Sequence, residues 1–393
     1  MANKVGSGRS VGPDAARTSA EAARAALEGL AGAKPAIGFL FASPSLPLGE
    51  CLRSASQVAN GARLIGCSTA GEFTEKGLSH GGVVVMLVST DSPHLMHTAT
   101  GVTGAAVDAA RELCKGFHPI SKDARQKGYV CSTTVTLVDG LSGAGERFVE
   151  SIVESTQALH QVVGGAAGDE GKFQATHVGE PEKAGSDMAA ALHLFTRGPW
   201  GMGIGHGLEP TPAKMRVTKA KANVVQEIDG RPAFAVYEEH ARKRGVTLSP
   251  ATAGEYLIAN ELGIIMAGKV TRARAPLSVG KDGSLTCAAE VPQGSHVAIL
   301  DGKPDAMVAA AREAANEALQ NLQGQEPAGV LLFDCVCRGL ILKDGFQREI
   351  DAVREVMGDV PVAGFLTYGE IASYSSRIES WHNTTAVALA IPQ

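Results

Sequence analysis

Apolar and polar positions follow two patterns along the chain, and together they predict an α/β fold. Short runs that are apolar throughout, such as Ile37–Ala42 and residues 83–88, are typical of strands buried on both faces. Segments with apolar positions at helical spacing lie between them. One is the alanine-rich segment 14–30, where Asp14 is a suitable N-cap.

The order of these predicted elements repeats three times. The unit is helix, strand, helix, strand, strand, and its copies occupy residues 14–89, 103–195 and 305–391. Such units predict mixed sheets covered by helices. Residues 197–303 interrupt the repeat with two helical stretches and a β-rich stretch, and residues 1–13, rich in Gly and Ser, are expected to be loose.

A turn sequence supports the repeat. Residues 66–72 and 364–370 share Gly, Thr, Gly and Glu at identical spacing, and residues 164–169 form a shorter copy that ends in Asp. The side chains could contact a ligand at equivalent ends of the sheets, or they could serve only the geometry of tight turns. The candidate ligand contacts in these turns are Thr69, Glu72, Tyr368 and Glu370.

Three further positions could carry chemistry. Arg338 follows a predicted strand, where a guanidinium could clamp a carboxylate or phosphate or pair with Glu349 or Glu370. His206 lies between glycines in a run that is neither G-x-G-x-x-G nor a P-loop, so its ring could meet a metal or planar ligand or be an ordinary loop histidine. His382 could bind a ligand or hydrogen-bond within its turn.

Charge and composition exclude several classes. The formal net charge is −5, without the basic excess that favours nucleic acid. There is no apolar run of signal-peptide or membrane-spanning type, and the seven cysteines include no C-x-x-C pair. The simplest interpretation is a reduced cytoplasmic protein. No base is marked beside a thiol, so we expect no enzyme.

Several of these stretches resemble the FIST family. Residues 64–73 resemble the signature of the FIST N-terminal domain, and residues 217–233 resemble the junction between the family's two halves. Residues 332–338, 364–371 and 382–385 resemble the FIST C-terminal domain, although Asp334 and Cys337 depart from its usual F-S-C-x-G-R. The expected organisation is an N-terminal tail and helix (1–30), a FIST N-terminal domain (31–228) and a FIST C-terminal domain (229–393).

The resemblance implies a sensory module of intracellular signalling. One branch of stand-alone FIST proteins binds haem and senses nitric oxide, and this chain resembles that branch in layout. The first hypothesis is therefore a cytoplasmic haem b sensor with His206 on the iron, His382 as the second choice, and a separate histidine kinase or cyclic-di-GMP enzyme as partner. The alternative is a FIST sensor of a small metabolite such as an amino acid, without haem. A homodimer is compatible with either.

Overall fold

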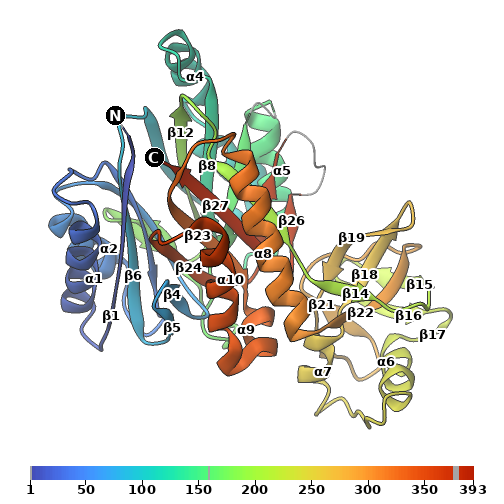
Figure 1. Cartoon of the computed structure of the whole chain (residues 1–393). Coiled ribbons are helices and arrows are strands. Elements are labelled where there is room, and N and C mark those ends of the chain that lie inside the picture. The colour runs from blue at the N-terminus through green and yellow to red at the C-terminus, as the bar shows by residue number, and fades with distance from the viewer. Residues whose placement is uncertain (1, 158–159, 375–379) are drawn as a thin grey trace.

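The computed structural model of the chain describes residues 2–157, 160–374 and 380–393 and confirms the α/β fold (Figure 1). Three mixed six-stranded sheets form a body, and a separate nine-stranded sheet belongs to the segment that interrupts the repeat. Each sheet of the body derives mainly from one repeat.

Each repeat begins with a strand that the sequence did not indicate. The first repeat runs β1 (Lys4–Val11), α1 (Ala15–Gly29), β2 (Ile37–Ala42), α2 (Leu48–Val58), β3 (Arg63–Ser68), the hairpin β4 (Glu72–Thr74) and β5 (Gly77–Ser79), and β6 (Gly82–Ser89). Strands β2 and β3 are parallel, and β6 lies antiparallel between β1 and β2. The expectation that residues 1–13 are loose is therefore wrong.

The second and third repeats follow the same plan. The second runs β7 (His94–Thr100), α3 (Val102–Leu113), α4 (Phe117–Gln126), β8 (Cys131–Val138), α5 (Gly145–Ser155), β9 (Gln161–Ala166), the hairpin β10 (Val178–Glu180) and β11 (Lys183–Gly185), and β12 (Met188–Thr196). The third runs β13 (Gly201–Gly205), then after the insertion α8 (Pro304–Asn321), β23 (Pro327–Cys335), α9 (Val336–Leu342), α10 (Gln347–Met357), β24 (Val362–Thr367), the hairpin β25 (Glu370–Ser373) and β26 (Trp381–His382), and β27 (Ala386–Pro392).

The three sheets are joined by exchanged hairpins. Strand β4 of the first repeat pairs with β24 of the third, β10 of the second pairs with β3 of the first, and β25 of the third pairs with β9 of the second. Each repeat thus donates its hairpin to another repeat's sheet, and the exchange closes into a ring. The body therefore depends on all three repeats.

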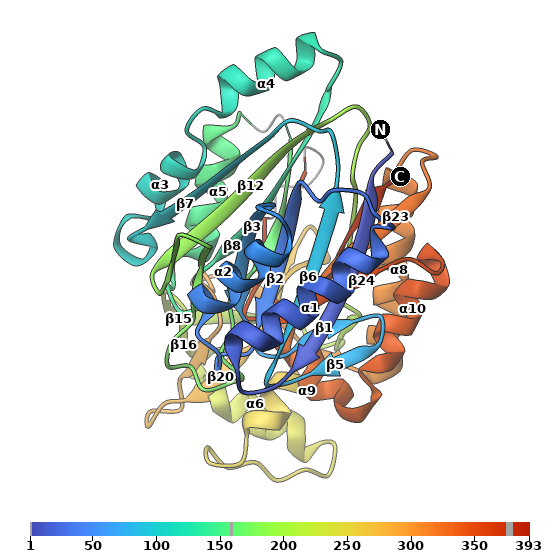
Figure 2. The same ribbon diagram turned by 90° about the vertical axis from the view of Figure 1, so that its left-hand side faces the viewer.

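The sheets bury both faces, which explains the strands that are apolar throughout. Alternate residues such as Phe39 and Phe41 face a central core shared by the three sheets, where Phe41 packs against Phe365 with ring centroids 4.7 Å apart. The intervening residues, such as Leu40, pack beneath the outer helices. Figure 2 shows α1 and α2 lying across one such outer face.

Glycines explain why the sequence pattern did not predict strands β1 and β13. A Cβ at Gly6 or Gly8 would lie 2.0 or 2.1 Å from backbone oxygens of α1. Gly201 and Gly203 of β13 stand in the same relation to α8, at 1.9 and 2.0 Å. The glycines let helix and strand backbones touch, so the run 201–207, interpreted from the sequence as a loop, is for the most part a strand.

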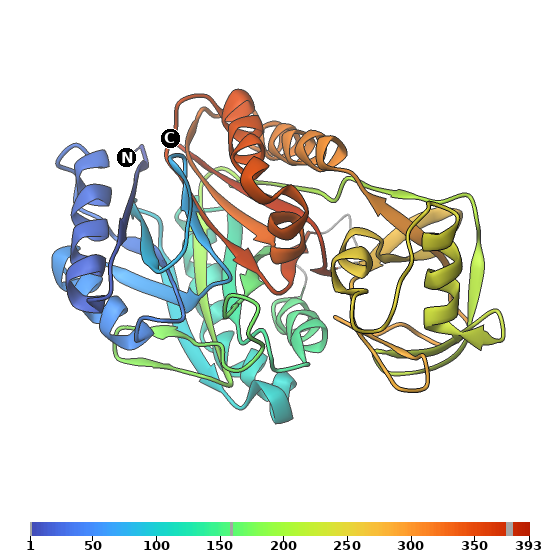
Figure 3. The same ribbon diagram turned by 90° about the horizontal axis from the view of Figure 1, so that it is seen from below.

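The insertion folds as a β-rich unit beside the body (Figures 1 and 3). Its helices α6 (Ala233–Arg242) and α7 (Gly254–Ala259) match the two predicted helical stretches. Its strands are β14 (Leu208–Pro210), β15 (Met215–Lys221), β16 (Val224–Ile228), β17 (Arg231–Pro232), β18 (Leu262–Met266), β19 (Lys269–Arg274), β20 (Pro276–Val279), β21 (Leu285–Cys287) and β22 (His296–Gly302). These residues have their own hydrophobic core, which includes Val217, Tyr237 and Ile299.

Candidate functional site

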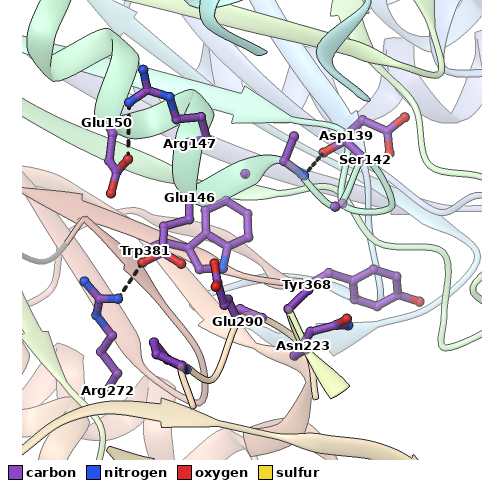
Figure 4. Close-up of a pocket in the computed structure, with 18 residues that line it drawn as sticks. Asp139, Ser142, Glu146, Arg147, Glu150, Asn223, Arg272, Glu290, Tyr368 and Trp381 are labelled. Carbon is purple, nitrogen blue, oxygen red and sulfur yellow. Dashed lines mark hydrogen bonds and ion pairs between the residues drawn. The ribbon is translucent and has the colours of Figure 1, made fainter. Parts of the chain in front are cut away.

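A cleft of about 520 Å³ lies where the body meets the inserted unit. The loop after β8 and the first turns of α5 form one wall, Tyr368 and Trp381 of the third repeat form another, and residues of the inserted unit, Asn223 and Arg272 among them, form the rest (Figure 4). Its volume is in the range of a small-molecule site. Three parts of the chain therefore converge on one ligand-sized space.

The wall at α5 is joined to the inserted unit by an ion pair. Arg272 Nη1 lies 2.8 Å from Glu146 Oε1, and the buried Arg274 lies 3.5 Å from the other carboxylate oxygen. Arg274 also donates to the backbone oxygen of Glu290 at 3.0 Å. Glu146 stands in the first turn of α5, where the helix dipole favours a negative charge. The cleft is thus held across the junction by charge.

The aromatic wall is packed against glycines. A Cβ at Gly145 would lie 2.2 Å from the Trp381 ring, and one at Gly369 would lie 2.3 Å from it. The indole consequently sits directly on the start of α5. The Tyr368 hydroxyl donates to Asp169 and accepts from the Gly171 amide at 2.8 Å, and its ring stacks on Phe173. Both rings are therefore fixed before any ligand arrives.

Apart from Tyr368, the predicted turn residues lie outside the cleft, in a ring of turns. The Ala70 amide donates to Leu366 O at 3.0 Å, and the Tyr368 amide donates to Ala166 O at 3.1 Å. The Gly168 amide completes the ring by donating to Ser68 O at 3.0 Å. The three copies of the turn sequence thus meet and hydrogen-bond to one another. This arrangement gives those residues a structural task.

Matching Thr–Glu pairs occur in two of these turns. Thr69 Oγ1 donates to Glu72 at 2.9 Å, and Thr367 Oγ1 donates to Glu370. Glu72 also accepts from the Gly82 amide at 3.0 Å, and Glu370 accepts from the Thr385 amide at 3.0 Å. Burial raises the pKa of Glu72 to about 8 and the pKa of Glu370 to about 7. Four of the candidate contacts lie in these turns, and of those four only Tyr368 lines the cleft.

Arg338 is fully buried in α9, where it contacts two carboxyl groups. Its guanidinium pairs with Glu349, lies 3.1 Å from Asp334, and donates to His206 O at 2.8 Å. Burial raises the pKa of Asp334 above its ordinary value. Of the two carboxylates proposed from the sequence as structural partners of Arg338, Glu349 is the one that it contacts.

A second buried carboxyl links the inserted unit to the body. Glu261 directly precedes β18, and its carboxyl accepts a hydrogen bond from the Thr384 hydroxyl. Both side chains are fully buried, and burial raises the pKa of Glu261 to about 8. Thr384 has a φ of 56°, an unfavourable value for a β-branched residue. This contact ties the two units at a strained position.

The two candidate histidines lie outside the cleft. His206 follows β13, is half-buried, and its Nδ1 accepts from the Leu208 amide at 2.9 Å. His382 is buried in β26, with Nε2 3.2 Å from Ala372 O. Neither lines the cleft or the grooves described next.

Two grooves occupy the places in the other repeats that correspond to the cleft. One of about 330 Å³ lies between the start of α2 and the hairpin β10–β11, with Pro44, Pro47 and Ala184 among its lining. The other, of about 800 Å³, lies between α9 and the hairpin β4–β5, and its lining includes Leu78, His80 and Leu340. Each repeat thus leaves a hollow between a helix start and an incoming hairpin.

Most of the cleft's charged residues were not anticipated from the sequence. Glu146, Arg272 and Glu290 carry no motif. The one signal for the loop was its composition, because residues 139–145 form a glycine-rich segment between a strand and a helix start, where α/β proteins commonly bind ligands. Arg272 could not be foreseen, since its place depends on how the inserted unit packs on the body.

The fold and cleft define a class: a three-repeat α/β protein with a ligand-sized cleft against an inserted β-rich unit. The chain belongs to the FIST family, because the FIST N domain matches residues 36–231 and the FIST C domain matches residues 233–373. FIST domains are generally small-ligand sensing domains, sensory rather than catalytic.

Its relatives include an uncharacterized protein of Mycobacterium tuberculosis, 25% identical over 99% of this chain and 100% of that protein. An uncharacterized protein of Methanocaldococcus jannaschii is 28% identical over 45% of this chain and 34% of its own length.

Among the described residues, no helix is both long and apolar enough to cross a bilayer.

Proposed function

We propose that the chain is a sensor of a small polar metabolite such as an amino acid, and that the ligand binds in the cleft between the body and the inserted unit. The observation that carries this proposal is the convergence of three parts of the chain on one cleft lined by charges of both signs. A polar, charged lining suits a small metabolite better than an apolar macrocycle.

The junction offers a way to pass the signal on. A ligand that contacts both the inserted unit and the body favours the arrangement in which the two units are closed together, since binding shifts a protein toward the state it contacts best. The Glu146–Arg272 pair and the Glu261–Thr384 contact cross the same junction. The output is proposed to reach a separate histidine kinase or cyclic-di-GMP enzyme in the cytoplasm.

Tryptophan fluorescence gives a direct test, because the chain has two tryptophans and only Trp381 lines the cleft. Trp200 is 1% exposed in the core. In the Trp200→Phe variant, a metabolite panel that includes each amino acid is expected to contain a compound that changes the emission saturably. The matched Trp381→Phe variant retains Trp200 and is expected to show no change. If no compound of the panel changes the emission of Trp381, the proposal is contradicted.

Haem b is the second candidate, and one observation favours a different histidine for it. His206 and His382 line none of the hollows described above, whereas His80 lines the groove of about 800 Å³ together with apolar side chains of Leu78 and Leu340. Haem ligation by one histidine in an apolar setting is physically ordinary. In this groove His80 would hold the iron and Lys76 would pair with a propionate. Bound there, haem would supply an iron that takes nitric oxide.

An absorption spectrum tests this second candidate. Protein supplied with haem is expected to show a Soret band that shifts with dithionite and nitric oxide, and His80→Ala is expected to remove it while His206→Ala keeps it. If only His206→Ala loses the band, the iron ligand is His206, as expected from the sequence. A colourless protein with no saturable haem titration would eliminate haem.

A further inference from the structure

The charges that line the cleft do not balance. Its lining carries the carboxyl groups of Asp139, Glu146, Glu150 and Glu290 and the guanidinium groups of Arg147 and Arg272. Both arginines are already paired: Arg272 with Glu146 at 2.8 Å, and Arg147 with Glu150 at 3.5 Å. A ligand anion would have to compete with these carboxylates for each guanidinium.

The N-terminal end of α5 also already has a carboxylate beside it. Glu146 places its own carboxylate in the first turn, and the Leu141 amide in the loop before α5 donates to Asp139 at 2.8 Å. The helix end that would attract an anion therefore already has negative charge beside it. An added anion would meet repulsion from Glu146.

Glu290 is the exception among the carboxylates. Its carboxylate makes no hydrogen bond or ion pair with the residues that the structure describes, and its side chain lines the cleft. Its backbone is held from beneath by Arg274, whose side chain is 1% exposed. An exposed carboxylate that makes no such contact thus lines the cleft on the inserted unit.

An aromatic ring lies beside this carboxylate. Trp381 lines the cleft from the body, and Figure 4 shows its indole next to Glu290, whereas the Tyr368 ring extends away from both. An ammonium group over an aromatic face near a carboxylate is a recurrent way to bind an organic cation. The cleft therefore combines an electron-rich wall with an uncompensated carboxylate.

We infer that the cleft recognises a ligand bearing an ammonium group, an amine or a basic amino acid, with Glu290 as its counter-charge and Trp381 as its aromatic wall. This inference rests on the proposed function, since it names the ligand class of the same cleft. An amine held between Glu290 and Trp381 bridges the inserted unit and the body, so its charge would drive the closure.

Isothermal titration calorimetry with matched probes tests the inference. Butylamine, agmatine and lysine are titrated against butyrate and glutarate at neutral pH. The amines are expected to bind saturably and the acids are not. Glu290→Gln is expected to weaken amine binding by at least about tenfold, and the control Glu313→Gln, an exposed carboxylate of α8 outside the cleft, is expected to match the native protein.

Folding of both variants is checked by thermal melting, and wild-type titrations at rising salt give a second measure, because screening weakens an exposed charge contact. Binding of the acids instead of the amines, equal amine affinity in Glu290→Gln, or no binding of either class would overturn the inference. If other metabolites still change the emission of Trp381, the proposed function survives that result. If none does, both fail.

Discussion

The cleft at α5 and the groove at α2 occupy corresponding places in two repeats, yet their linings differ completely. The groove has Pro44, Pro47 and Ala184 around it and His177 as its one titratable side chain. The cleft is lined by charged and aromatic groups, of which Arg272 and Glu290 come from the inserted unit. The repeat therefore supplies a hollow in each copy, and in one copy the inserted unit adds Arg272 and Glu290 to the lining.

In the third repeat, the corresponding helix start carries a buried ion pair. At the start of α9, Arg338 turns inward and pairs with Asp334 and Glu349. Arg338 thus stabilises the interior of the body, whereas Arg272 lies in the wall of the cleft. Substitutions at these two positions should separate folding from binding.

Arg338→Met is expected to have the largest effect. It leaves two carboxyl groups buried without their cation, and breaking a buried pair in this way typically costs about 3–5 kcal/mol. Urea denaturation should show this loss in the free energy of unfolding. A variant as stable as the native protein would show that the Arg338 cluster does not stabilise the body.

Gly145→Ala is expected to destabilise less, by about 1–3 kcal/mol, because the new methyl group would meet the Trp381 ring at 2.2 Å. Gly49 is the second residue of the corresponding helix α2, and a Cβ there would have Arg53 Nη1 at 3.4 Å as its nearest neighbour. Gly49→Ala should therefore be neutral or slightly stabilising by helix propensity. Equal denaturation midpoints for the two variants would contradict the tight packing of the cleft.

The buried Glu72 predicts a pH dependence of stability. Its pKa is about 8 in the folded chain against an ordinary value of 4.5, so the unfolded chain loses the proton first as pH rises. The free energy of unfolding should fall through this window, at up to about 1.4 kcal/mol per pH unit. Glu72→Gln, which mimics the neutral acid, should reduce the slope without removing it, because the buried Glu261 and Glu370 also have raised pKa values. Glu313→Gln should leave the slope unchanged. A slope unchanged in Glu72→Gln would show that this carboxyl is not its source.

Arg272→Met is expected to change stability least, by under about 1 kcal/mol, because its side chain is 30% exposed and paired with one partly exposed carboxylate. Its effect should fall on the cleft, where Glu146 loses its main partner and the wall becomes more negative. Calorimetry with lysine should then show tighter binding than in the native protein. Weaker lysine binding would indicate that Arg272 contacts the ligand.

The sequence predicted much of the fold because buried strands and amphipathic helices leave strong local patterns. Ile37–Ala42 is a strand over the expected residues, and the helix N-cap at Asp14 is confirmed by its hydrogen bond from the Arg17 amide. The strands β1 and β13 were missed since glycine, which weakens a strand pattern, is what lets α1 and α8 approach them. At these two strands the local composition disfavours a strand, whereas the tertiary packing requires the glycines.

The cleft could not be predicted from the sequence for a different reason. Tyr368 was singled out, but its partners in the lining, Arg272 and Glu290, are brought to it only by the packing of the inserted unit. The exchange of hairpins, which carries Trp381 onto α5, likewise depends on contacts between distant repeats. The binding roles assigned to His206, His382, Arg338, Glu370, Thr69 and Glu72 stay predictions, as do the domain limits, haem b and the homodimer.

Hydrogen–deuterium exchange with and without saturating lysine tests most directly that the insertion makes one of three equivalent hollows into the ligand site. The account predicts slower amide exchange in residues 139–150 and 286–292, which line the cleft from both units, with residues 43–50 beside the α2 groove unchanged. Protection of residues 43–50 instead, or no protection of either region, would contradict it.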